Sequence, residues 1–164
     1  MDLFMNQLSA LCRRLSQAAL VLASLALAGL GIVVVYGVFM RYVLNAQPAY
    51  VEQVALLLVI CVAMFGASVG VYSAGHIGLD SVVKLLPPGG QRLCAWLGDL
   101  CVLCFSVVLC LGSLEMIDAT RGNVIPTLGL PEACRYLLPF LAGLLVSLFS
   151  IERLLRAWFP QRAN

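Results

Sequence analysis

The chain has 164 residues, of which 62% are hydrophobic and 11% are charged, and its formal net charge is +2. A soluble domain is typically about 45–50% apolar and about 25% charged. This composition therefore excludes an ordinary soluble enzyme and a disordered chain, and it predicts an integral membrane protein. The Lys and Arg residues are scattered, which argues against nucleic acid as a partner. The length predicts a single membrane domain over residues 1–164.

Four apolar runs predict an all-α fold with four transmembrane helices, because a spanning helix needs about 20 apolar residues. The predicted spans cover about 18–40, 51–72, 93–116 and 136–157. The start of the first run is similar to a cleaved signal peptide. However, its apolar stretch continues for twelve residues beyond Ala28, so we interpret it as a retained helix.

Two short amphipathic segments, about 3–16 and 79–86, are predicted to lie along the inner surface of the membrane. The apolar residues on one face of the first segment are Phe4, Leu8, Leu11 and Leu15. A simple extension of the first span is the alternative for this segment. The stretch Asp118–Glu132 contains several Gly and Pro residues and is predicted to be irregular structure outside the bilayer.

The positions of the basic residues predict the orientation of the chain in the membrane. Seven of the ten Lys and Arg residues lie on the side that holds both termini and the connection between the second and third spans. Because cytoplasmic segments carry an excess of Lys and Arg, both termini are predicted to be cytoplasmic.

Small residues predict where the helices approach one another, since close packing drives helix association in lipid. Gly66 and Gly70 form a G-x-x-x-G pattern in the second span, and Gly143 lies four residues before Ser147 in the fourth. Two interpretations stay open for these positions. They either pack the helices of this chain together or form a docking face for another membrane subunit.

Charged residues within spans are candidates for function. Arg41 ends the first span and Glu52 begins the second, so an ion pair between them would hold that hairpin at its outer end. Asp99 lies near the inner end of the third span, with Arg92 two turns away on the same face. Since no charge lies near the middle of the membrane, the sequence argues against a proton-coupled exporter and against a pore.

The sequence contains seven Cys residues and one His. Cys101 and Cys104 form a C-x-x-C pair inside the third span, which leaves a membrane thiol redox protein as an alternative function. Buried apolar thiols are inert, however, so we interpret the cysteines as packing residues. We expect neither a catalytic site nor a metal site. A stand-alone small transporter is the other alternative.

A set of short motifs in fixed order carries a family resemblance. These motifs are Arg41–Asn45, Pro48–Glu52, Phe65–Ala67, Gly75–Asp80, Thr127–Pro131 and Tyr136–Pro139. Together they resemble the small membrane subunit, DctQ-like, of tripartite ATP-independent periplasmic (TRAP) transporters. Two positions depart from the family pattern: Tyr50 stands where Trp is frequent, and Gln53 stands where a second acidic residue is frequent.

The resemblance implies a scaffold subunit, not an enzyme, in the bacterial inner membrane. A periplasmic binding protein would capture a substrate, usually an organic acid with a carboxylate. A large membrane subunit would bind sodium and substrate and move them. This chain would pair with that large subunit, in an expected 1:1 ratio, and help to dock the binding protein. It would contact lipids but hold no cofactor, because the sodium site is expected in the large subunit.

The resemblance also implies roles for particular residues. The residues expected to brace the outer end and dock a partner are Arg41, Asn45, Tyr50, Glu52, Thr127 and Pro131. His76 and Asp80 are expected to fix the inner loop against the large subunit or lipid headgroups.

Overall fold

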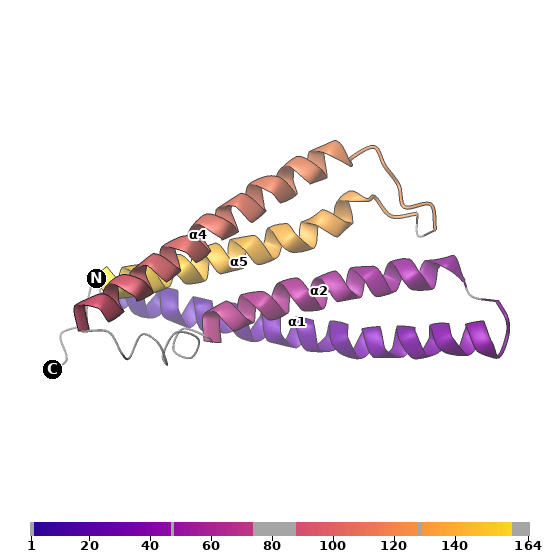
Figure 1. Cartoon of the computed structure of the whole chain (residues 1–164), viewed down its shortest axis with the longest axis horizontal. Coiled ribbons are helices and arrows are strands. Elements are labelled where there is room, and N and C mark those ends of the chain that lie inside the picture. The colour runs from indigo at the N-terminus through magenta and orange to yellow at the C-terminus, as the bar shows by residue number, and fades with distance from the viewer. Residues whose placement is uncertain (1, 47, 74–87, 128, 159–164) are drawn as a thin grey trace.

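Four long helices make up most of the protein, as the computed structural model shows for residues 2–46, 48–73, 88–127 and 129–158 (Figure 1). The helices are α1 (Asp2–Tyr42), α2 (Ala49–Ser73), α4 (Pro88–Ala119) and α5 (Ala133–Trp158). Each contains a stretch that is long and apolar enough to cross a membrane. The structure therefore confirms the predicted fold class with its four spanning helices.

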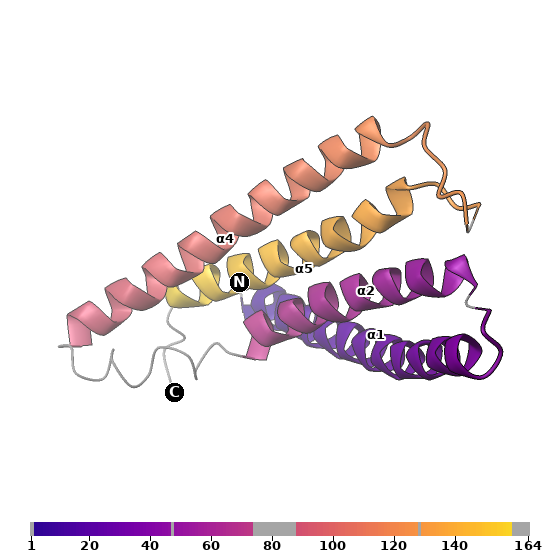
Figure 2. The same ribbon diagram turned by 45° about the vertical axis from the view of Figure 1, so that its right-hand side comes forward.

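The four helices are arranged as two hairpins. α1 pairs with α2, α4 pairs with α5, and the hairpins meet where α2 packs against α5 (Figures 1 and 2). α1 also contacts α5, less extensively. Both hairpin loops lie at one end of the molecule, which we call the loop end and which holds residues 43–46 and 120–127. α1 begins and α5 finishes at the opposite end, which we call the terminal end.

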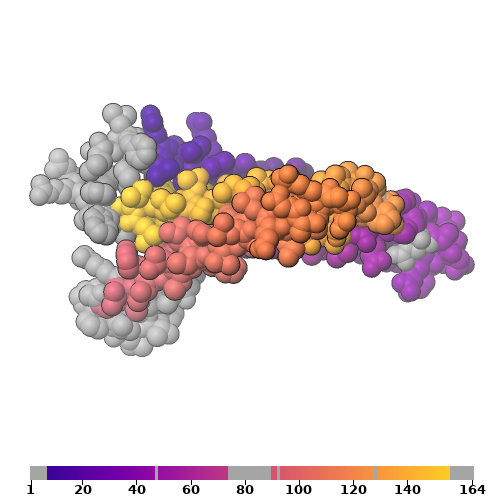
Figure 3. Space-filling view, turned by 90° about the horizontal axis from the view of Figure 1, so that it is seen from above, coloured from indigo at the N-terminus to yellow at the C-terminus, as the bar shows by residue number. Residues whose placement is uncertain are grey.

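Seen from above, the molecule is long and narrow (Figure 3). α4 and α5 cover most of the face in this view, and the α1–α2 hairpin extends beyond them at the loop end. The two hairpins thus lie in layers, with α2 and α5 as the central contact between them.

α1 is a single continuous helix of 41 residues, from Asp2 to Tyr42. The segment 3–16 is therefore helical and continuous with the first span. Its position along the inner surface of the membrane stays a prediction. At 1.5 Å per residue the helix is about 60 Å long, whereas the hydrocarbon core of a bilayer is about 30 Å thick. α1 must consequently tilt or project from the membrane, and the exposed Arg13 and Arg14 lie in its first half.

The core between the hairpins is lined by small side chains of α1. Its buried residues follow a repeat of four and three positions: Cys12, Ser16, Ala19, Ala23 and Ala26. Cys61 and Phe65 of α2 complete the central cluster, and Leu138 and Leu145 of α5 pack against it. Small residues let helix backbones approach closely, which is the main source of helix association in lipid.

The helix ends follow simple backbone chemistry. α4 starts at Pro88, where a missing N–H costs nothing because the first turn has no intrahelical acceptor. Pro139 lies inside α5, so the carbonyl of Arg135 lacks its usual helical donor. The loop between α4 and α5 is irregular, as predicted, with one isolated bridge between Val124 and Pro131. The predicted amphipathic segment 79–86 lies outside the described residues.

Buried hydroxyl groups inside the spans are satisfied by carbonyls of their own helix. The donors and acceptors are Ser68 and Phe65 at 2.8 Å, Ser106 and Leu103 at 2.8 Å, and Ser113 and Leu109 at 2.7 Å. These serines therefore contribute small volume at the helix contacts without leaving unpaired polar groups in lipid.

Candidate functional site

A charged network joins three helices near the terminal end. Arg153 of α5 places Nη2 2.8 Å from Oδ1 of Asp99 on α4. Its Nη1 donates a hydrogen bond of 3.2 Å to the carbonyl of Val71 on α2. The side chain of Asp99 is 13% exposed and that of Arg153 is 32% exposed. One guanidinium thus links both hairpins, and its charge is balanced within the chain.

An aromatic pair joins α2 and α5 close in sequence to the residues of this network. The rings of Tyr72 and Phe149 lie 5.0 Å apart at 55°, and Phe149 is fully buried. Glu152, next to Arg153, is also buried, at 4% exposure. The sequence placed Arg92 beside Asp99, but the structure gives Asp99 the partner Arg153, and the side chain of Arg92 is outside the described atoms.

A second polar contact joins the hairpins at the loop end. Arg135, in the first turn of α5, donates a hydrogen bond of 2.9 Å from Nη2 to Oε1 of Gln53 on α2. Nε of Arg135 is buried and has no hydrogen-bond partner among the described residues. The arginine at the loop end, Arg135, therefore contacts a neutral amide, whereas Arg153 near the terminal end contacts a carboxylate.

The predicted brace between Arg41 and Glu52 is not among the ion pairs of the described residues. Arg41 instead lies over its neighbour, with Cζ 6.0 Å from the centroid of the Tyr42 ring. Glu52 is exposed. The α1–α2 hairpin is joined here by the hydroxyls of Tyr36 and Tyr50, which lie 3.2 Å apart.

The six residues predicted to dock a partner all lie at the loop end and are all exposed. They are Arg41, Asn45, Tyr50, Glu52, Thr127 and Pro131. Asn45 has a φ of 49°, in the left-handed region that Asn tolerates in turns. Hydrogen bonds of 2.9 Å between the backbones of Ile125 and Leu130, and of Gly129 and Ile125, give the second loop a defined shape. His76 and Asp80 lie outside the described residues.

The three glycines predicted to pack helices lie in different environments. A Cβ at Gly143 would lie 2.7 Å from Sγ of Cys110 and 3.3 Å from the carbonyl oxygen of Ser106, so this glycine allows α4 and α5 to touch. Gly66 and Gly70 are exposed, and nothing lies within 4 Å of a Cβ built at either. Gly66 and Gly70 therefore do not pack the helices of this chain together, and their contact with another membrane subunit stays a prediction.

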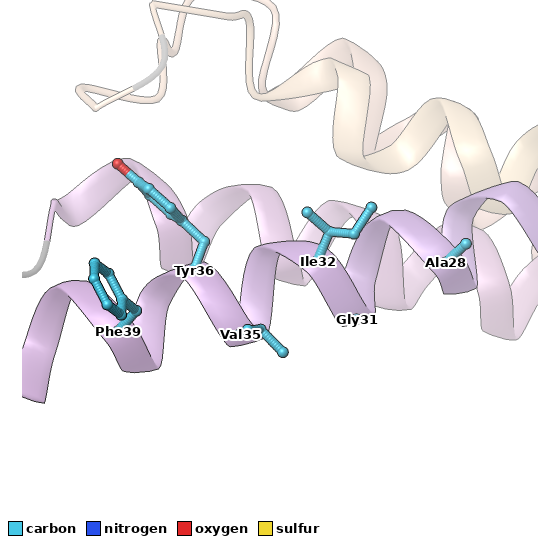
Figure 4. Close-up of a pocket in the computed structure, with 6 residues that line it drawn as sticks. All are labelled: Ala28, Gly31, Ile32, Val35, Tyr36 and Phe39. Atoms are coloured by element: carbon cyan, nitrogen blue, oxygen red, sulfur yellow. The ribbon is translucent and has the colours of Figure 1, made fainter.

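α1 carries a shallow apolar groove on a face that its own bundle leaves exposed (Figure 4). It is lined by Ala28, Gly31, Ile32, Val35, Tyr36 and Phe39. Ile32 and Val35 are 70% and 69% exposed. The groove therefore combines large apolar side chains with the small residues Ala28 and Gly31 at one end, a shape that lipid or a partner helix can fill.

Comparisons with known proteins identify the family. The family of tripartite ATP-independent periplasmic transporters, DctQ component, matches residues 30–159. This chain belongs to the DctQ family.

Individual relatives agree with this assignment. A TRAP transporter small permease protein of Haemophilus influenzae is 30% identical over 133 residues, which cover 81% of this chain and 83% of that protein. A second small permease protein of the same organism is 22% identical over 127 residues, 77% of each chain. The C4-dicarboxylate TRAP transporter small permease protein DctQ of Vibrio cholerae is 32% identical over 76 residues, 46% of this chain and 33% of that protein.

Membership of the DctQ family fixes the general role of the chain. It is a small permease subunit of a transporter and not an enzyme. Its four apolar helices make it a multi-pass protein of the bacterial inner membrane. DctQ components work with a large TRAP membrane subunit and a substrate-binding protein.

The thiols of this DctQ-family chain are spread over the bundle. None of the seven forms a disulfide bond, and they range from the buried Cys12 and Cys61 to the exposed Cys101 and Cys104. Within the described residues, no group of three or more His, Cys, Asp or Glu side chains is placed to hold a metal ion.

Sequence reasoning missed both contacts between the hairpins. The sequence suggests no partner for Arg153, and it distinguishes Gln53 only as a departure from the family pattern. The available signal was weak: Gln53 and Arg135 each lie near the start of an apolar helix, and both helices start at the loop end.

Proposed function

We propose that this chain is the fixed scaffold subunit of a sodium-coupled, binding-protein-dependent importer of an organic acid. It pairs with the large membrane subunit in a 1:1 ratio and helps to dock the periplasmic binding protein. The substrate and sodium sites belong to the large subunit, and this chain holds no cofactor.

The observation that carries this proposal is the distribution of charge along unbroken helices. Substrate and ion sites of secondary transporters are typically built near the bilayer midplane from interrupted helices. In the described residues, each of the four helices is continuous. The ionisable groups in contact between helices gather at the two ends, as the pairs Arg153–Asp99 and Arg135–Gln53 illustrate. Such a bundle is suited to act as a static wall beside a moving subunit.

The substrate class is supported by a relative and by the family. The relative from Vibrio cholerae is named for C4-dicarboxylate transport. An organic acid with at least one carboxylate is therefore the substrate class that we propose for the complex that contains this chain.

The orientation is supported by the arrangement of the basic residues. α1 begins and α5 ends at the terminal end (Figure 1), and the sequence predicts that seven of the ten Lys and Arg residues are on that side. Since cytoplasmic segments are enriched in Lys and Arg, we place the terminal end in the cytoplasm. The loop end then faces the periplasm, where a binding protein can reach the exposed Glu52 and Thr127.

Reconstitution tests the proposal. Liposomes would contain the large subunit with or without this chain, and uptake of labelled C4-dicarboxylates would be measured with binding protein outside and an inward sodium gradient. We expect uptake only when all three proteins and the gradient are present. Undiminished uptake without this chain would contradict the scaffold role, and uptake by this chain alone would establish a stand-alone transporter.

A further inference from the structure

The two arginines that join the hairpins differ in how their charge is balanced. Arg153 meets the carboxylate of Asp99 at 2.8 Å and the carbonyl of Val71 at 3.2 Å. Arg135 meets only the amide oxygen of Gln53, at 2.9 Å. Both residues lie within the apolar stretch Ala133–Leu155 that is able to cross a membrane. Of these two arginines, Arg135 is the one whose charge has no counterpart among the described residues.

Nearby carboxylates do not supply that counterpart. Glu52 precedes Gln53 on α2 but is exposed, and Glu132 lies three residues before Arg135. Neither forms an ion pair with Arg135 in the part of the chain that the structure describes. Gln53 is the only residue there to which the side chain of Arg135 donates a hydrogen bond, and it carries no charge.

The guanidinium of Arg135 also has an unused donor. Its Nε–H is covered by the chain itself and has no acceptor among the described residues, which is unfavourable for a buried donor. The rest of this half-buried side chain is what a group outside the chain can reach. A guanidinium presents its N–H groups as a planar fork that matches the two oxygens of a carboxylate. Charged groups within membrane segments pair with an opposite charge or a backbone carbonyl almost without exception. The unbalanced charge and the planar shape of the guanidinium together favour a carboxylate from outside this chain as its partner.

We infer that Arg135 binds a carboxylate side chain of the large membrane subunit, at the loop end of the contact between α2 and α5. This inference rests on the proposed function, because it needs the large subunit as a neighbour. A membrane-embedded partner suits the site, since Arg135 lies inside a spanning stretch and its side chain is only half-buried, so that an adjacent subunit can reach the guanidinium. A soluble binding protein meets the exposed loop residues first.

The test is co-purification of the large subunit with the tagged chain from membranes in mild detergent. For Arg135→Gln we expect at least a tenfold lower ratio of large subunit to tagged chain than for the wild type. Arg135→Lys keeps the charge without the fork and should give an intermediate ratio. Arg121→Gln is the matched control, because Arg121 lies at the same end, is 75% exposed and already pairs with Asp118 at 2.9 Å.

Two variants of Gln53 separate binding from folding. Gln53→Ala removes the same hydrogen bond as Arg135→Gln but leaves the guanidinium in place, so we expect a ratio within twofold of the wild type. Gln53→Glu supplies an internal carboxylate, which should raise the thermal stability of the isolated chain and lower the recovery of the large subunit. If Gln53→Ala loses as much large subunit as Arg135→Gln, the contact only holds this chain together and the inference is overturned.

Three other outcomes would also overturn the inference. One is an unchanged ratio in Arg135→Gln. Another is a variant that keeps the large subunit but no longer responds to the binding protein, which would assign the site to that partner. The third is a wild-type ratio that falls on delipidation and returns with phosphatidylglycerol, which would assign the site to a lipid phosphate. If the wild-type chain recovers no large subunit at all, the proposed function itself fails.

Discussion

Arg153 and Asp99 form an ion pair of 2.8 Å between α5 and α4, and the same arginine donates to the carbonyl of Val71 on α2. Three of the four described helices therefore meet at one guanidinium. Because Asp99 is mostly buried, removing its charge leaves the partner cation in a poorly solvated position. Substituting one member of this pair therefore tests whether the ion pair holds the two hairpins together near the terminal end.

Asp99→Asn should destabilise the isolated chain by about 2 kcal/mol, because it leaves Arg153 without a counter-charge. Arg153 is 32% exposed, which keeps the cost below that of a fully buried pair. The measurement is thermal or denaturant unfolding in detergent micelles. Asp118→Asn is the control, since the pair of Asp118 and Arg121 is exposed and should contribute less than about 0.5 kcal/mol. Equal losses in both variants would contradict a special role for the network.

Gly143 and Gly70 provide a matched pair of glycines. A Cβ at Gly143 meets Sγ of Cys110 at 2.7 Å, so Gly143→Ala should cost about 1–3 kcal/mol through overpacking. Gly70→Ala adds its methyl group to open space and should leave the isolated chain unchanged or slightly more stable. Unfolding of the two variants in micelles measures the difference.

The complex provides the second measurement for these glycines. If Gly70 contacts another subunit, Gly70→Ala lowers the recovery of the large subunit without destabilising the chain. Rescue of Gly143→Ala by Cys110→Ala would show that the clash with the thiol causes its loss of stability. A destabilised Gly70→Ala chain would contradict the open environment of that glycine.

The four helices and their approximate limits follow from the sequence because each is an apolar run of sufficient length between polar segments. The neighbours of each helix do not follow, because α2 and α4 are apolar on almost every face, so that periodicity carries little information about their buried side. On α1, for example, the structure buries Ala19, Ala23 and Ala26, which the sequence pattern alone does not distinguish from the exposed Gly31.

The polar contacts were still harder to predict. Asp99 and Arg153 are more than fifty residues apart in the sequence, and so are Gln53 and Arg135. Each contact depends on which helices lie side by side and on their rotation about their own axes. The six docking residues were easier to place at one end, because loop positions follow directly from the order of the spans.

Arg41 and Glu52 should act independently at the loop end. If both residues contact a partner, Arg41→Gln and Glu52→Gln should each lower binding-protein-dependent uptake. The two residues form no ion pair with each other in the structure. The two effects should add, because residues without a shared contact rarely couple. Uptake by reconstituted complexes measures both single variants and the double variant. Restoration of uptake by exchanging the two charges would instead show that they pair in the assembled transporter.

Two alanines of α1 allow the internal and external faces of the helix to be compared. Ala23 is 8% exposed within the core, whereas Ala28 lines the exposed groove. Ala23→Leu forces a large side chain between α1 and α2 and should destabilise the isolated chain by about 1–3 kcal/mol. Ala28→Leu fills the groove and should leave the stability of the isolated chain within about 0.5 kcal/mol of the wild type.

Recovery of the large subunit then shows what occupies the groove. If a partner helix lies against Ala28 and Gly31, Ala28→Leu separates the two backbones and lowers recovery, while the chain stays folded. If lipid fills the groove, recovery is unchanged, because acyl chains adapt to the added side chain. A loss of stability in Ala28→Leu comparable to that of Ala23→Leu would contradict the assignment of these two residues to opposite faces of α1.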